Sequence, residues 1–305
     1  MRKRYLSNAV YSGLILAFFL LAEPAQLFAE LVTYPAPMGI EANKDYIVNV
    51  NDKELFVYPG KIDTGYFVSP PAVMDPIIIG YSYFDFSGKV QIKVQFKDFN
   101  SLQSVKIRPL AHKIAGKISG NTVTFEISQA ANICVEPNGD YEKAIFIFAN
   151  PLEINPPRDG DDNVTYYGPG VHEIGVKKIR DNEIVYIAGG AYCKGRFVAE
   201  KAKNWQIRGR GIVDQSVFFP QAINTISTMD SEDFDIEGII LIAYRGWMVR
   251  LGNSRDINID NIKLIGWGQN SDGIDPVGTV NLYVKNSFIR NYDDPVVLKS
   301  DENGL

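Results

Sequence analysis

The chain has 305 residues, of which 46% are hydrophobic and 22% are charged. This balance is typical of a globular protein and excludes a disordered chain, and the length favours two domains over one. The formal net charge of -5 argues against a nucleic-acid-binding protein, which needs a basic surface.

The N-terminus has the pattern of a secretory signal peptide. Basic residues at positions 2 to 4 precede an apolar stretch from Val10 to Ala22, and Ala29 is the expected cleavage point. The alternative is an uncleaved membrane anchor, but this stretch is short beside the ~20 apolar residues of a membrane-spanning helix. We therefore expect residues 1–29 to be a signal peptide and the mature protein to be secreted or periplasmic, without membrane attachment.

Residues 30–158 carry the pattern of an all-β domain. Ile92, Val94 and Phe96 alternate with polar residues, as in a strand with one buried face, and residues 123–127 repeat this pattern. Residues 144–148 are apolar throughout, which suits a central strand. Short strands separated by Gly, Asn and Asp predict an antiparallel β-sandwich.

The sequence offers few side chains that bind transition metals. Cys134 and Cys193 are the only cysteines, and His112 and His172 are the only histidines. An exported protein permits a disulfide between the cysteines, but two separate buried thiols are an equal alternative. Because these residues do not cluster, we expect no zinc site, and no other cofactor is indicated.

A polar stretch separates the first domain from the rest of the chain. Residues 155–162 read Asn-Pro-Pro-Arg-Asp-Gly-Asp-Asp. A calcium-binding loop would need a further acidic residue at its far end, so a solvated linker is the preferred interpretation. We place the domain boundary here, with the sandwich at 30–158 and the second domain at 159–305.

Beyond the linker, an apolar pattern repeats every 23 to 29 residues. Four segments align, and their third residues (Ile207, Ile236, Ile259 and Val284) recur at intervals of 29, 23 and 25. Each segment is followed by a second apolar group, and a third group recurs at Met248-Val249, Gly273-Ile274 and Val296-Val297-Leu298. Three short strands per repeat are typical of a right-handed parallel β-helix, whose stacked coils bury a common core. A leucine-rich repeat and a β-propeller fit less well, because the leucine pattern is absent and the repeats are too short for four strands.

Three aspartates lie one repeat apart near the end of this domain. Asp272 precedes the pair Asp293 and Asp294 by 21 residues. The third apolar group places residues 273–275 beside residues 296–298, so the acids should lie on the same side of neighbouring coils, roughly 4.8 Å apart along the axis. Clustered carboxylates raise one another's pKa and can divide the acid and base roles of glycosidic-bond hydrolysis. A solvated, Asp-rich corner is the alternative interpretation.

Three segments around these acids share a known pattern. Residues 270–275 read Asn-Ser-Asp-Gly-Ile-Asp, residues 291–294 read Asn-Tyr-Asp-Asp, and residues 297–300 read Val-Leu-Lys-Ser. This pattern resembles the active-site core of family 28 glycoside hydrolases, the polygalacturonases and their relatives, although Pro295 replaces the usual Cys. That family also has a His and an Arg-x-Lys further on, and the sequence stops at Leu305 before either. The resemblance therefore implies a β-helix domain that is incomplete at its C-terminus.

Segments upstream carry a second resemblance. Residues 147–151 read Ile-Phe-Ala-Asn-Pro, 167–172 read Tyr-Gly-Pro-Gly-Val-His, 185–191 read Val-Tyr-Ile-Ala-Gly-Gly-Ala, and 207–211 read Ile-Arg-Gly-Arg-Gly. These segments resemble the family 49 dextranases and isopullulanases, which join a sandwich to a β-helix. Both families imply an inverting hydrolase of polysaccharides with three catalytic aspartates.

Carried over residue by residue, the resemblance implies a role for each acid. Asp293 would be the general acid, which the neighbouring charges should keep protonated, while Asp272 and Asp294 would hold and deprotonate the attacking water. Inversion requires room for that water, with ~6.5 to 9.5 Å between the carboxyl groups.

Four further residues are expected to bind the substrate. They are Asn270, Lys299, Arg245 and Trp247. Trp247 would offer an aromatic face to a sugar and Arg245 a charge to a uronate, although a place at the edge of the core and an ordinary surface position are the respective alternatives.

We therefore expect a monomeric, polygalacturonase-like glycoside hydrolase that acts on a polysaccharide without a cofactor. The alternatives are an α-glucan hydrolase of the dextranase or isopullulanase kind and an inactive, carbohydrate-binding β-helix. A pectate lyase would need calcium ligands and an arginine base, and the sequence shows no such arrangement.

Overall fold

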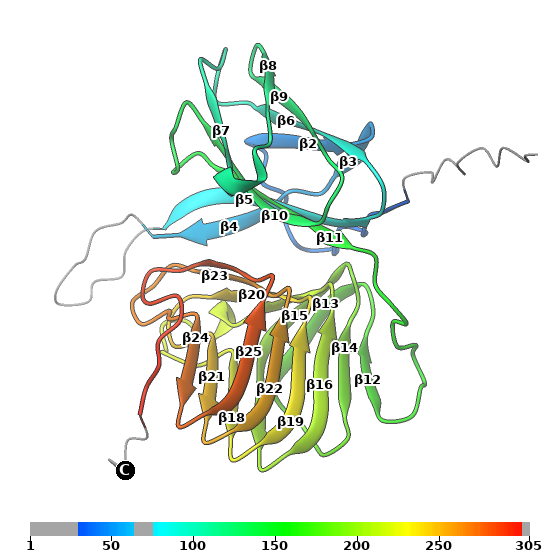
Figure 1. The fold of residues 1–305 in the computed structure, drawn as a ribbon, viewed down its shortest axis with the longest axis vertical. Helices are drawn as coiled ribbons and strands as arrows, with labels where there is room; N and C mark the ends of the chain where they lie inside the picture. Colours follow the sequence, from blue (N-terminus) through cyan, green and yellow to red (C-terminus); the bar gives the residue numbers. More distant parts are fainter. Residues whose placement is uncertain (1–29, 64–75, 301–305) are drawn as a thin grey trace, which may run out of the picture.

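A computed structural model describes residues 30–63 and 76–300 of the chain, and the predicted signal peptide lies outside these residues. The described part is all-β, as the sequence predicted, with 26 strands and two short 3-10 helices (Figure 1). Within these ranges, no helix has the length and apolar character that a membrane span requires.

The first part of the chain forms two packed β-sheets. One sheet has the order β1-β5-β11-β10-β7, with β4 beside β5. Its strands are β1 (Leu31–Val32), β4 (Tyr58–Ile62), β5 (Ile77–Phe86), β7 (Val105–Arg108), β10 (Ala131–Pro137) and β11 (Ile145–Pro151). The other sheet has the order β3-β2-β6-β9-β8. Its strands are β2 (Tyr46–Val50), β3 (Lys53–Leu55), β6 (Val90–Phe96), β8 (Lys117–Ser119) and β9 (Thr122–Ile127), and the 3-10 helix η1 (Leu110–His112) follows β7.

The predicted β-sandwich is confirmed, with one difference in strand direction. Ile92, Val94 and Phe96 of β6 are buried, as their alternation predicted, and β11 is a central strand between β5 and β10. However, β5 and β11 are parallel rather than antiparallel. The chain visits the second sheet between them, which supplies the long crossover that a parallel pair needs.

The remaining strands stack in three parallel rows and form a β-helix (Figure 1). The first row contains β12 (Val164–Tyr167), β14 (Ile184–Ile187), β16 (Lys203–Gly209), β19 (Glu232–Glu237), β22 (Arg255–Asp260) and β25 (Val280–Lys285). The second contains β17 (Ile212–Asp214), β20 (Ile240–Ala243), β23 (Lys263–Gly266) and β26 (Phe288–Arg290). The third contains β18 (Ile226–Met229), β21 (Val249–Gly252) and β24 (Ile274–Val277), while the 3-10 helix η2 (Ser216–Phe218) follows β17. All pairs within these rows are parallel.

One long strand joins the second and third rows. The first half of β15 (Ala191–Glu200) pairs with β17, and its second half pairs with β18. Most of β15 also pairs with β13 (Gly170–Lys178). The strand bends at Gly195, whose φ of 148° and close approach to the carbonyl of Gly175 exclude a side chain. In the later coils this bend widens into a turn, and the predicted acids lie on that turn.

The predicted coil register is confirmed in the first row and for Val249 with Ile274 in the third row, and it is wrong by one residue between the last two coils of the third row. Ile207, Ile236, Ile259 and Val284 are register partners, as their spacing predicted. In the third row, Ile274 faces Val296, whereas the sequence alignment placed Gly273 there. The reason is that the amides of Gly273 and Ile274 donate to the carbonyls of Asp294 and Pro295, at 2.9 and 3.0 Å, which shortens the coil by one residue.

The sandwich rests directly on the second row of the β-helix (Figure 1). One apolar cluster contains Tyr81 and Phe148 from the sandwich together with Ile240, Ile265 and Trp267 from the coils. Beside it, the buried guanidinium of Arg210 contacts Asp85 of β5 at 2.9 Å. These contacts give the two parts a continuous hydrophobic and polar interface. Both cysteines are free: Cys134 lies in β10 and Cys193 in β15, so the disulfide alternative is wrong.

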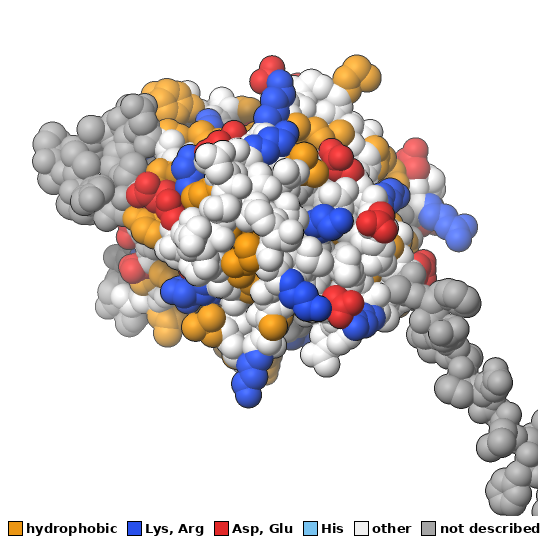
Figure 2. Space-filling view, turned by 90° about the horizontal axis from the view of Figure 1, so that it is seen from above, with side chains coloured by type: hydrophobic (Ala, Val, Ile, Leu, Met, Phe, Trp, Pro, Cys, Tyr) orange, Lys and Arg blue, Asp and Glu red, His pale blue; other side chains and the backbone are white. Residues whose placement is uncertain are grey.

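The sandwich end of the molecule carries charges of both signs. In Figure 2, Lys and Arg side chains lie interspersed with Asp and Glu over this face. The sandwich also carries exposed ion pairs, among them Lys89–Glu126 and Lys143–Asp98. The described side chains on this face therefore alternate in sign rather than forming a single-sign field.

Candidate active site

The three predicted acids lie on the turns that lead into the third row of two neighbouring coils. Asp272 comes just before β24, and Asp293 and Asp294 come between β26 and the bridge from Val296 to Ile274. Because parallel coils stack in register, these two turns lie against each other. The spacing of one repeat has therefore brought the acids together.

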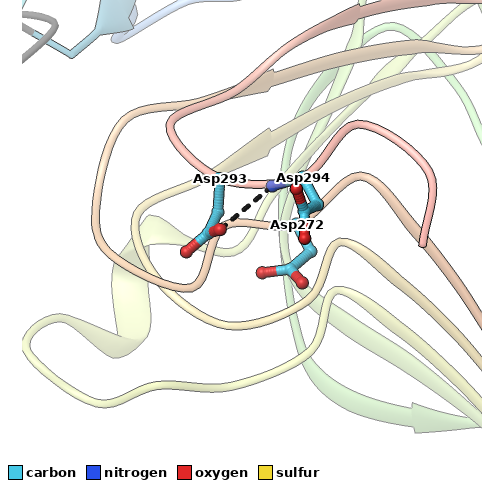
Figure 3. A group of neighbouring side chains, drawn as sticks. All are labelled: Asp272, Asp293 and Asp294. Atoms are coloured by element: carbon cyan, nitrogen blue, oxygen red, sulfur yellow. Dashed lines mark hydrogen bonds between the residues drawn. The ribbon is translucent and has the colours of Figure 1, made fainter. Parts of the chain in front are cut away.

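The carboxylates form one compact group (Figure 3). Each residue offers one oxygen, and these oxygens all lie within 4.8 Å of one another. Asp272 is buried, at 6% exposure, whereas Asp293 is half-buried and Asp294 is exposed. The group thus changes from buried to solvent-facing across a few ångströms.

The turn that carries Asp293 and Asp294 is fixed by its neighbours. The side-chain amide of Asn291 donates to the carbonyls of Ser271 (2.8 Å) and Asp294 (3.0 Å). The two Asp293 oxygens accept from the backbone amides of Asn270 (3.3 Å) and Asp294 (3.1 Å), the second of which Figure 3 draws as a dashed line. These bonds hold the Asp293 carboxylate against the turn of the previous coil.

The sandwich also reaches this turn. Arg290, directly before it, contacts Asp63 of the sandwich at 2.7 Å and donates to the carbonyl of Asn291 at 3.1 Å. A residue at the end of β4 therefore braces the base of the acidic turn, a contact that no local sequence signal announces.

Lys299 is the cation of the group. Its ammonium contacts Asp272 Oδ2 at 3.0 Å and also pairs with Asp275, and it lies 3.7 Å from the centre of the Trp247 ring. Burial opposes its charge, but the hydrogen bonds to Asp275 and Asp272 outweigh burial and raise the pKa of Lys299. The structure thus brings two predicted substrate-binding residues, Lys299 and Trp247, together with the acids.

Asp275 is a member of the site to which the sequence analysis gave no role. It lies in β24 with no exposed surface, and its Oδ2 has no hydrogen-bond partner among the described residues. Desolvation raises its pKa to about 7, Lys299 opposes this shift, and the charge of Asp272 adds to it. The available signal was an ionisable residue inside the apolar run of residues 274–277, where a core side chain is expected.

Two predicted residues contribute less. Asn270 has a left-handed backbone (φ 58°) and takes part through its amide, which donates to Asp293. Arg245 forms no ion pair with the acids among the described residues, and its Nε is buried without a partner there. Its carbonyl instead accepts from the side-chain amide of Gln215 at 3.1 Å, which shapes the neighbouring turn.

The acids could chelate a divalent cation by distance, but this group does not by itself make a metal site. Exposed acidic groups are common without an ion, and Lys299 already supplies positive charge to the buried member. Asp293, Asp294 and Asp272 are instead suited to proton transfer, since they differ in burial and stand close enough to share one solvent molecule.

Comparisons with known proteins bear on the fold. No family model matches the sequence, and no curated protein sequence matches it. Among solved structures, Dex49A from Penicillium minioluteum is similar over 90% of this chain and 77% of its own, with a TM-score of 0.52 and 15% sequence identity. A structure from Parabacteroides merdae, described as a "putative glycosyl hydrolase", covers 44% of this chain at 18% identity, and its TM-score of 0.35 is too low to support an argument. The chain therefore shares with Dex49A the fold in which a β-sandwich precedes a parallel β-helix.

Proposed function

We propose that this protein is a glycoside hydrolase that cleaves a neutral α-glucan, with Asp293 as general acid and Asp272 and Asp294 as the groups that position and deprotonate water. The observation that carries the proposal is the cluster of three carboxylates on adjacent coils, with oxygens within 4.8 Å of one another. The dextranase-like alternative is favoured over the polygalacturonase-like one by the likeness to Dex49A over both the sandwich and the β-helix.

Charge at the site argues for a neutral substrate. Among the described residues, Asp272, Asp293 and Asp294 bring three carboxylates together, and Asp272 and Asp275 both hold the ammonium of Lys299. A uronate would bring further negative charge and would find this lysine already occupied. A neutral glucan carries no such penalty, and its hydroxyl groups can donate hydrogen bonds to the exposed carboxylates.

The division of labour follows from position. Asp293 is half-buried, between the buried Asp272 and the solvent, where its carboxyl would give a proton to the oxygen of the leaving group. Asp272, held by Lys299, is placed to take a proton from water. Asp294 lies at the solvent side, where that water enters.

Stereochemistry gives the proposal an independent readout. Inverting enzymes separate their carboxyl groups by ~6.5 to 9.5 Å and retaining enzymes by ~5 to 5.5 Å. The nearest oxygens here lie within 4.8 Å, so inversion requires the Asp293 carboxyl to turn outward as substrate and water enter. Proton NMR of the first product released distinguishes inversion from retention.

The test is release of reducing ends from dextran, pullulan, galacturonan and rhamnogalacturonan. We expect hydrolysis of an α-glucan, and Asp293→Asn should lower turnover about 100-fold or more while leaving the unfolding midpoint nearly unchanged. The matched control is Asp233→Asn, an exposed aspartate with φ of 56°, a backbone that asparagine also adopts. No release from any polymer would refute the proposal, cleavage of galacturonan alone would refute the substrate class, and unchanged turnover in Asp293→Asn would remove that residue as the acid.

A further inference from the structure

The ammonium of Lys299 is enclosed on three sides. It contacts Asp272, pairs with Asp275 and lies over the face of Trp247, and only 28% of its side chain is exposed. A cation over an aromatic ring is stabilised by the electrons of the ring, most strongly where water is excluded. These three contacts engage the ammonium of Lys299 within the protein, so it is poorly placed to bind a substrate.

Asp275 is costly to the fold. A buried carboxylate destabilises a protein unless it is paired, and here one oxygen has a partner and the other has none among the described residues. An apolar residue at this place in β24 would serve the core better, as Ile274 and Val277 do on the same strand. The carboxylate therefore has a use other than stability, and its one partner is Lys299.

The arrangement forms a chain that ends on the predicted base. Asp275 contacts Lys299, and Lys299 in turn contacts Asp272 Oδ2. An ammonium at 3.0 Å holds Asp272 Oδ2 and thereby fixes the direction in which the other oxygen of this carboxylate points.

We propose that Lys299 and Asp275 are positioning residues for Asp272: Asp275 anchors the ammonium of Lys299, and Lys299 holds Asp272 Oδ2 so that the other oxygen of Asp272 is oriented to accept the proton of water. This inference rests on the proposed function and deepens it. It also replaces the role of substrate contact that the sequence suggested for Lys299, and it makes Trp247 a support for the lysine.

The experiment measures the pH profile of kcat/KM and the separate kcat and KM of variants on the glucan that the wild type cleaves. In Lys299→Met we expect kcat to fall about tenfold or more with KM nearly unchanged. The acidic limb of the pH profile should move to higher pH by about half a unit or more, because the positive charge beside the carboxylates of the site is removed. Lys299→Arg should restore the limb, since the charge returns.

The control is Lys285→Met in the same final coil. Lys285 pairs with Asp260 at 3.4 Å, and its side chain is 58% exposed, so this variant should match the wild type.

A second test measures kcat when Asp275→Asn and Lys299→Met are introduced separately and together. Because the two residues act in one chain, Asp275→Asn should lower kcat in the wild type but cause no further loss in Lys299→Met.

The outcomes separate this inference from the proposed function. A wild type without activity on any polymer overturns the proposed function and this inference with it. If the wild type is active but Lys299→Met raises KM and leaves the acidic limb of the pH profile in place, the inference alone is overturned. The same holds if the kcat reductions of Asp275→Asn and Lys299→Met multiply when the two changes are combined. If Lys299→Met does not fold by circular dichroism, Lys299→Gln replaces it, and an unmoved limb in Lys299→Gln equally overturns the inference.

Discussion

The buried ion pair between Arg210 and Asp85 predicts a large, pH-dependent loss of stability in Arg210→Met. Both side chains are 2% exposed, and the guanidinium Nε lies 3.1 and 2.9 Å from the two Asp85 oxygens. Arg210 also donates to the carbonyl of Pro151 at 3.1 Å, so it ties the first coils to the sandwich. Methionine keeps much of the apolar stem and removes all of these donors.

The expected magnitude follows from what is left behind. Removing one partner of a buried ion pair typically costs about 3 to 5 kcal/mol, because the other charge stays buried. Two features lower the cost here. Asn150 still donates to Asp85 at 3.1 Å, and the charge of Arg210, which with burial lowers the pKa of the nearby Lys263, no longer opposes the charged form of that lysine. We therefore expect a loss of about 3 kcal/mol at pH 8.

The loss should shrink at low pH. Burial raises the pKa of Asp85 and Arg210 opposes this, so removing Arg210 leaves the folded-state pKa further above the unfolded value. Between those two values the folded state binds more protons than the unfolded state, and stability falls as pH rises. The variant should thus be closer to the wild type at pH 5 than at pH 8.

Urea unfolding followed by tryptophan fluorescence at both pH values measures this effect. The control is Arg255→Met, which removes an exposed pair with Glu232 and should cost at most about 1 kcal/mol. The reasoning is refuted if Arg210→Met loses no more than this control, or if its loss is the same at pH 5 and pH 8.

Two further predictions concern the β-helix. Asp275→Asn should flatten the pH dependence of stability between about pH 4 and 7. The pKa of Asp275 is raised to about 7 in the folded state, so the wild type loses stability as pH rises through this window. The loss is at most on the order of 4 kcal/mol. Urea unfolding across that range tests this, and parallel curves for the two proteins would contradict it. Trp205→Ala should lower stability by about 3 to 5 kcal/mol, because Trp205 is 1% exposed and its ring stacks on Phe234 with 4.2 Å between the ring centres. The control is Tyr283→Ala, which should change stability by less than about 0.5 kcal/mol because Tyr283 is 69% exposed. Equal losses in the two variants would count against the stacked core.

Much of the candidate site was predictable because its acids follow the coil repeat. Asp272 and Asp293 lie one turn of the β-helix apart, and stacked coils must bring such positions together. Lys299 was predicted as a site residue, but its role was not, because a lysine's partners depend on the tertiary environment. Asp275 was given no role, because an ionisable residue in the apolar run of residues 274–277 is a weak signal until its burial is known.

The periodicity of the sequence by itself determined the class of fold and the coil register of its first row, because apolar residues that repeat at one interval must face one shared core. The tertiary structure decided the rest. The parallel pairing of β5 and β11, the one-residue shift at Ile274 and Val296, and the contact of Asp63 with Arg290 each depend on residues far apart in the chain. Hydrogen bonds and ion pairs of this kind are fixed by how whole sheets dock, and no local pattern of residues encodes that docking.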